Sequence, residues 1–131
     1  MNQSEQQFQE LLAHAIARVK ATLREHGRVP AFGLQLQPDG NVQLALETTE
    51  AGNPSVDLLI EHLNDQASKG ALVACAIVHR AEDNQPLSVF LENNAHYCAD
   101  VTIPFHSGSP LDLDVENMSV GAGAVRIFRR M

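Results

Sequence analysis

His96, Cys98 and Asp100 occupy alternate positions within the segment 90–105, FLENNAHYCADVTIPF. A base, a thiol and a carboxylate are the groups that a Cys/His nucleophilic site or a metal site would use. The same alternation arises on the polar face of a β-strand, because successive side chains of a strand point to opposite faces. The spacing therefore supports two interpretations, a reactive site and a structural polar face.

The register of the surrounding hairpin favours the structural interpretation. With residues 93–95 as a three-residue loop, Glu92 faces His96, and Glu92, His96, Cys98 and Asp100 form one polar face. The apolar residues then share the opposite face: Leu87, Val89, Leu91, Tyr97, Ala99, Val101, Ile103 and Phe105.

Neighbours on one face of a strand lie about 7 Å apart, whereas a base must lie within about 3.2 Å of a thiol to activate it. We therefore predict no catalytic residue in this segment.

Metal and cofactor sites have little support in the sequence. Zinc-type ligands are present, but no C-x₂-C pair accompanies them: Cys75, His79, His96, Cys98 and His106. The glycines of GAGAV at 121–125 lack the third glycine of a nucleotide fingerprint. We therefore expect no cofactor and no bound metal. A Cys/His enzyme, using Cys98 with His96 or a pocket around His79 and His106, stays the least favoured hypothesis.

Charge is distributed unevenly along the 131 residues. The chain carries a net charge of −7, and residues 29–125 hold only Lys69 and Arg80 against thirteen acids. An acidic body repels phosphate backbones, so we expect no nucleic-acid partner. The candidate acidic patch comprises Glu47, Glu50, Glu82, Asp83, Asp112, Asp114 and Glu116. DLDVE at 112–116 lacks the glycine of a calcium loop, which favours an exposed acidic strand edge.

Local signals predict a helix, a hairpin and a second helix in the first half of the chain. Ser4 and Gln7 have capping-box spacing, and Gly27 suits the end of the first helix. The turn Pro38-Asp39-Gly40 predicts a hairpin over 32–46 in which Leu36 faces Val42 and Phe32 faces Leu46. Its six apolar residues then share one face. Asn53 and Pro54 open the second helix, and Gly70 ends it.

The second half predicts three strands and an irregular tail. ALVACAIVHR at 71–80 is apolar on both faces, which indicates a strand covered on two sides. The hairpin of 87–105 follows, and the glycine-rich residues near the end favour a loop. The expected fold is one α+β domain over 1–131, helix–hairpin–helix–three strands, with a five-stranded antiparallel sheet. Such chains usually pack their helices on one face of the sheet.

Two resemblances accompany this pattern. The element order resembles that of the roadblock/dynein-light-chain and profilin-like domains. The chain also resembles a group of small uncharacterised bacterial proteins through Phe32, the Asp39-Gly40 turn, Leu91-Glu92, Pro104-Phe105 and Ile127-Phe128. The second resemblance spans roughly residues 30–128 and implies no activity, but it implies that the tail belongs to the fold.

These observations favour a non-enzymatic interaction module whose partner is another protein or a second copy of the chain. The alternative is an acidic immunity-type inhibitor that blocks a basic toxin by charge complementarity. The polar start of the sequence and its two cysteines favour reduced thiols in the cytoplasm, and no apolar run is long enough for a membrane span.

Overall fold

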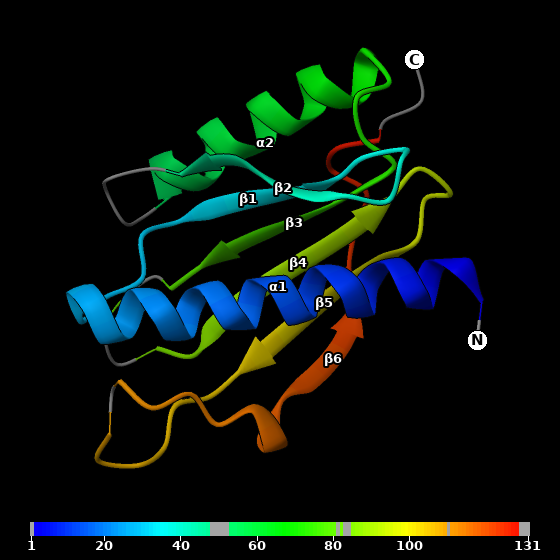
Figure 1. Cartoon of the computed structure of the whole chain (residues 1–131). Helices are drawn as coiled ribbons and strands as arrows, with labels where there is room; N and C mark the ends of the chain where they lie inside the picture. Colours follow the sequence, from blue (N-terminus) through cyan, green and yellow to red (C-terminus); the bar gives the residue numbers. More distant parts are fainter. Residues whose placement is uncertain (1, 48–52, 81, 83–84, 110, 129–131) are drawn as a thin grey trace.

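Two helices and six strands make up the part of the chain that the structure describes (Figure 1). The computed structural model describes residues 2–47, 53–80, 82, 85–109 and 111–128. The helices are α1 (Gln3–His26) and α2 (Asn53–Ser68), and η1 (Val115–Asn117) is a 3₁₀ helix. The strands are β1 (Phe32–Leu36), β2 (Val42–Glu47), β3 (Ala74–His79), β4 (Leu87–Asn93), β5 (Cys98–Ile103) and β6 (Ser119–Ala122).

The described strands form one antiparallel sheet in the order β2-β1-β3-β4-β5-β6. The α+β class is therefore confirmed, but the prediction of five strands is wrong. The sixth strand, β6, lies in the segment predicted to be irregular and pairs with β5 from Ser119 opposite Thr102 to Ala122 opposite Ala99. All four of its residues are exposed, so no apolar alternation marks it in the sequence.

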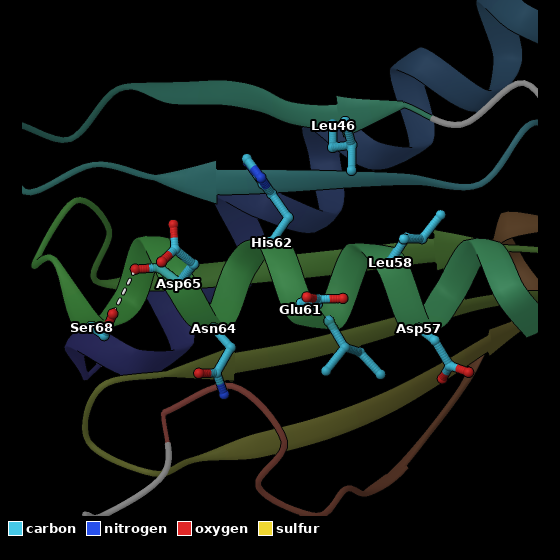
Figure 2. Close-up of a pocket in the computed structure, with 9 residues that line it drawn as sticks. Leu46, Asp57, Leu58, Glu61, His62, Asn64, Asp65 and Ser68 are labelled. Carbon is cyan, nitrogen blue, oxygen red and sulfur yellow. Dashed lines mark hydrogen bonds between the residues drawn. The ribbon is translucent and has the colours of Figure 1, made fainter.

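The two helices pack on opposite faces of the sheet, not on one face as expected. Strand β3 shows this directly, because Ala76 and Val78 belong to the core beneath α1 while Cys75 and Ile77 belong to the core beneath α2. In Figure 2, α2 lies in front of the sheet and α1 behind it. The predicted two-sided burial of this strand is therefore explained by a helix on each side.

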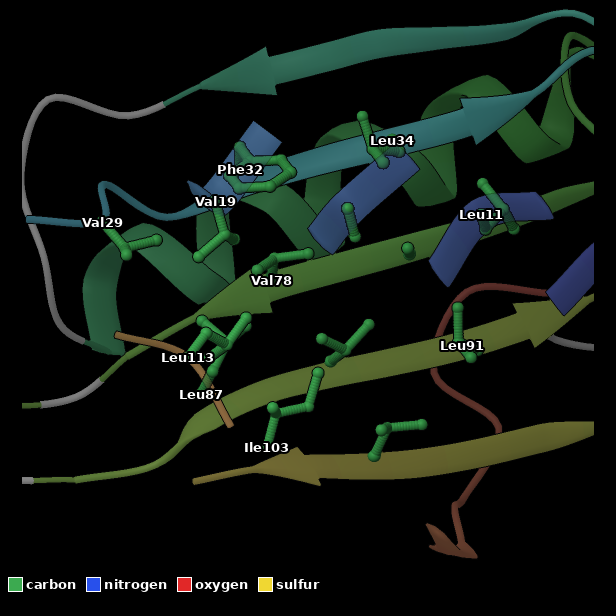
Figure 3. Packing of buried hydrophobic residues seen from close by; sticks show 14 of the residues in the cluster. Leu11, Val19, Val29, Phe32, Leu34, Val78, Leu87, Leu91, Ile103 and Leu113 are labelled. Carbon is green, nitrogen blue, oxygen red and sulfur yellow. The ribbon is translucent and has the colours of Figure 1, made fainter. Parts of the chain in front are cut away.

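The larger core lies between α1 and the sheet (Figure 3). Leu11, Ala15, Val19 and Leu23 recur every four residues on one side of α1 and are buried there. Gly27 ends the helix in a left-handed conformation, as predicted, and its N–H bonds to the Leu23 carbonyl. The predicted cap is wrong: Asn2 caps the helix, accepting from the Glu5 N–H.

The smaller core lies between α2 and the sheet. It includes Leu59 and Leu63 of α2, Ile77 of β3, Phe90 of β4 and Ile127 of the C-terminal segment. A Cβ at Gly33 would lie only 3.3 Å from Leu63 Cδ1, so the glycine lets α2 approach β1 closely. The burial of Ile127 shows that the C-terminal segment packs into this core.

The register of the first hairpin is confirmed beside the turn and wrong beyond a β-bulge. Leu36 faces Val42 and Leu34 faces Leu44, as predicted, but the register shifts between Gly33 and Leu34. Phe32 then faces Glu47 instead of Leu46. Because a one-residue shift exchanges the faces of a strand, Leu46 packs in the α2-side core and the six apolar residues do not share one face.

The second hairpin keeps the predicted faces but not the predicted pairs. Leu91 pairs with Ala99 and Glu92 with Cys98, two residues further along than expected. A shift of two residues preserves the faces, since side chains alternate with period two. The predicted pairing of Glu92 with His96 is therefore wrong.

The acidic segment after β5 does not form the predicted strand. Leu113 makes an isolated bridge to Phe105, and η1 follows at Val115. Leu113 is buried in the α1-side core, whereas Asp112 and Glu116 are exposed. The alternation of LDLDVE thus reflects Leu113 and Val115 packing on the α1-side core, not a sheet edge.

Candidate functional site

The predicted polar face does not assemble into a reactive site. Glu92 is fully buried, Cys98 and Asp100 are half-buried, and His96 is exposed in the β4–β5 turn. His96 has a φ of 66°, a left-handed conformation in which histidine is tolerated more often than most residues. It closes a loop of residues 94–96, flanked by the bond from Asn93 N–H to the Tyr97 carbonyl. His96 therefore leaves the strand that would have aligned it with Cys98.

Glu92 binds the backbone of the C-terminal segment. Its carboxylate accepts hydrogen bonds from the N–H groups of Arg126 at 2.7 Å and Ile127 at 3.0 Å, and from the N–H of Phe128. Three consecutive N–H groups directed at one carboxylate form an anion-binding arrangement of the backbone. We name this contact the tail clasp. Its role is structural, because protein atoms already occupy the carboxylate's acceptor positions.

Two free thiols flank Glu92 on neighbouring strands, Cys75 on β3 and Cys98 on β5. Burial raises the pKa of Cys75 well above the usual thiol range, with further contributions from Glu92 and Cys98. Burial also raises the pKa of Cys98, assisted by Glu92 and Asp100 and opposed by Arg126. The thiolate is the nucleophilic form of cysteine, so a catalytic thiol needs a lowered pKa. The pKa values of Cys75 and Cys98 are raised instead, which disfavours the thiolate.

We expect Cys98 to be alkylated by iodoacetamide more slowly than a free thiol at neutral pH. Its raised pKa means that less thiolate is present at any given pH, so the rate should keep rising beyond the pH at which glutathione levels off. Mass spectrometry across pH would measure this, with Cys98→Ser separating Cys98 from Cys75. A rate that levels off below pH 8 would restore the thiol enzyme hypothesis.

The two histidines of the alternative pocket differ in their surroundings. His79 lies at the end of β3 opposite Ser88, and burial and Arg126 lower its pKa. His106 lies after β5, where its ring is 3.8 Å from the Asp114 carboxylate and 4.0 Å from that of Asp112. Among the described residues, no group of three His, Cys, Asp or Glu side chains could hold a metal ion.

The candidate acidic patch divides into separate positions along one end of the sheet. Glu47 ends β2 and pairs with Arg18 of α1, whereas Asp112, Asp114 and Glu116 follow β5. Four strand spacings, about 19 Å, separate β2 from β5. Glu82 is exposed between β3 and β4, and Glu50 and Asp83 lie outside the described residues.

An open depression runs along the solvent side of α2 (Figure 2). Asp57, Glu61 and Asp65 recur every four residues beside it, and Leu58 is exposed there. Asp65 pairs with Lys69 at 3.0 Å. The surface is acidic and solvated, and its side chains do not converge on one point.

The outer edge of β6 is the surface that sequence reasoning missed. In the described part of the chain no strand pairs with this edge, which lies at the lower side of the sheet in Figure 1. Val120 is 66% exposed, and Tyr97, which directly precedes β5 near the β4–β5 turn, is 61% exposed. We define the β6 edge surface as Ser119–Ala122 together with Tyr97.

The hydrogen-bond pattern shows which backbone groups of β6 are free. Gly123 N–H bonds to the Cys98 carbonyl, which marks these residues as a hydrogen-bonded pair. Hydrogen-bonded and non-hydrogen-bonded pairs alternate in an antiparallel ladder. The Val101–Val120 and Ala99–Ala122 pairs are therefore non-hydrogen-bonded pairs. The N–H and C=O groups of Val120 and Ala122 consequently point away from β5, toward the open edge of the sheet.

The two edges of the sheet differ in their protection. Strand β2 belongs to a pair distorted by the bulge and ends in the charged Glu47, both of which discourage pairing with another chain. Strand β6 has the sequence SVGA, without charge, proline or bulge. The only sequence signal for this edge is the uncharged run from Met118 to Val125 in an otherwise acidic chain.

No family model, curated protein or solved structure matches the chain. None of the helices built from the described residues is long and apolar enough to cross a lipid bilayer.

Proposed function

We propose that this protein is a non-enzymatic interaction module that binds a protein partner by strand addition at the β6 edge surface. The observation that carries this proposal is the uncharged edge of β6, where Val120 and Ala122 present outward backbone groups beside exposed apolar side chains. An extended peptide that adds to a sheet edge gains main-chain hydrogen bonds, and apolar contacts with neighbouring side chains supply specificity.

The state of the cysteines supports a place in the cytoplasm as part of the same proposal. Cys75 and Cys98 are free thiols on strands that both neighbour β4. Free thiols persist in reducing compartments such as the cytoplasm.

A strand-forming peptide would test the binding mode. The probe is a synthetic peptide with the sequence of residues 117–124, NMSVGAGA, which is uncharged except at its ends. Titration monitored by NMR should shift the amide signals of Val120 and Ala122, because these N–H groups exchange water for a peptide carbonyl. The Tyr97 ring signals should shift with them.

Val120→Lys should abolish these shifts, since a lysine on an edge strand blocks pairing. Leu58→Lys is the matched control, as it places the same charge at an exposed leucine on α2 and should leave the shifts unchanged. Shifts confined to α2, or shifts that Val120→Lys leaves intact, would show that β6 does not accept a strand.

A further inference from the structure

We infer that the partner at the β6 edge surface is a second copy of this chain, related by a two-fold axis that passes beside Gly121. This inference rests on the proposed function and adds the identity of the partner and the register of the contact. In such a dimer, β6 pairs antiparallel with β6 of the second copy, and the two sheets become one continuous sheet. The same surface is used by both copies, as two-fold symmetry requires.

The free backbone groups determine this register. Only Val120 and Ala122 have outward N–H and C=O groups within β6, and they lie one residue on either side of Gly121. With the axis at Gly121, Val120 faces Ala122 of the second copy and Ala122 faces Val120. Each facing pair exchanges two hydrogen bonds. This is the arrangement that satisfies all of the outward groups of β6 in both copies.

The side chains agree with that register. Val120 and Ala122 share the α1-side face with Val101 and Ala99, so each Val120 packs beside Ala122 of the second copy. Tyr97 directly precedes β5, and its exposed ring adds a large side chain near the end of the β5–β6 pair at Ala99 and Ala122. At the axis, the two Gly121 residues form a non-hydrogen-bonded pair, in which Cα atoms approach to about 4.5 Å.

Charge favours a second copy at this edge and nowhere else along the described sheet edges. Two copies of net charge −7 repel each other, and charged residues lie at the end of β2 and after β5. The run from Met118 to Val125 carries no charge, so two copies can approach there without burying an acid. Salt screens the remaining repulsion over about 10 Å at 0.1 M, so the dimer should strengthen as salt is added.

Size-exclusion chromatography with light scattering tests the association. Four facing residues and two aromatic rings make a contact at the small end of specific interfaces, so the expected dimer dissociates on dilution. The unchanged chain should show a rise in mass with concentration and with salt, and Val120→Lys should stay monomeric. Leu58→Lys should behave as the unchanged chain does.

Disulfide cross-linking tests the register. In a Cys98→Ser background, Gly121→Cys should form a covalent dimer under mild oxidation, because the facing Cα atoms lie within disulfide range. A Cβ at this glycine meets only the Asp100 carbonyl oxygen at 3.9 Å, so the substitution fits. Ser119→Cys is the control: its two copies would lie about 14 Å apart along the strands. We expect at least about tenfold more cross-linked dimer from Gly121→Cys.

The outcomes separate this inference from the proposed function. A strict monomer that still binds the 117–124 peptide at β6 would overturn the second copy as partner and leave strand addition intact. A chain that neither dimerises nor binds the peptide would overturn both. A dimer that cross-links through Ser119→Cys instead would overturn the two-fold at Gly121.

Discussion

Glu92→Gln should lower the free energy of unfolding by about 3 kcal/mol, the range expected when charge-assisted hydrogen bonds to a buried group are lost. Glu92 is fully buried, and its two carboxylate oxygens accept from three backbone N–H groups of the tail clasp. Glutamine keeps the shape of the side chain, but it places an NH₂ donor where an acceptor is needed. The N–H groups of the C-terminal segment then lose part of their partner.

Urea unfolding followed by circular dichroism would measure the loss, and hydrogen exchange would locate it. The amides of Ile127 and Phe128 should exchange faster in the variant, since opening of the tail clasp costs less free energy. Glu61→Gln is the matched control, because Glu61 is exposed on α2 and its change should stay within about 0.5 kcal/mol. Equal stability of the two variants would show that the tail clasp contributes nothing to folding.

Asn93→Ala should cost about 4 kcal/mol, because one buried side chain makes four hydrogen bonds of about 1 kcal/mol each. Its Nδ2 donates to Ser4 Oγ at 2.8 Å and to Gln7 Oε1 at 3.0 Å. Its Oδ1 accepts from the N–H groups of Ala95 and Tyr97, each at 3.1 Å. Asn93 therefore joins the first turn of α1 to the β4–β5 turn.

Thermal or urea unfolding would measure this effect as well. Asn94→Ala is the control, since the neighbouring Asn94 is exposed in the same turn. Hydrogen exchange should show faster exchange at Ala95 and Tyr97 in Asn93→Ala alone. An unchanged midpoint in Asn93→Ala would mean that water replaces the four partners without loss.

Local sequence patterns predicted an element correctly wherever the interactions that form it lie within a few residues of one another. The helical period of Leu11, Ala15 and Val19 and the Pro38-Asp39-Gly40 turn led to correct elements, because turn chemistry and burial act over such distances. The bulge at Gly33 was not predictable from the hairpin itself. It brings Leu46 into the α2-side core, and α2 follows later in the chain.

The partners of the polar face could not be predicted for a different reason. Glu92 has the correct strand and the correct face, but its partners are backbone N–H groups 34 to 36 residues away. Backbone donors are the same in every sequence apart from proline, so no residue type marks them. Strand β6 was missed because it is recognised by its pairing with β5, while both of its faces remain exposed.

Two neighbouring residues of β4 bind the two ends of the described chain. Asn93 forms hydrogen bonds with the first turn of α1, and Glu92 accepts hydrogen bonds from the segment 126–128. During translation at about 5–20 residues per second, α1 is made long before Asn93, and the partners of Glu92 follow Glu92 by about 2 to 7 seconds. For that interval, the Glu92 carboxylate lacks the three N–H groups that it binds in the folded chain. The α2-side layer can therefore close only after Phe128 has left the ribosome, so a truncated product should stay open to proteases.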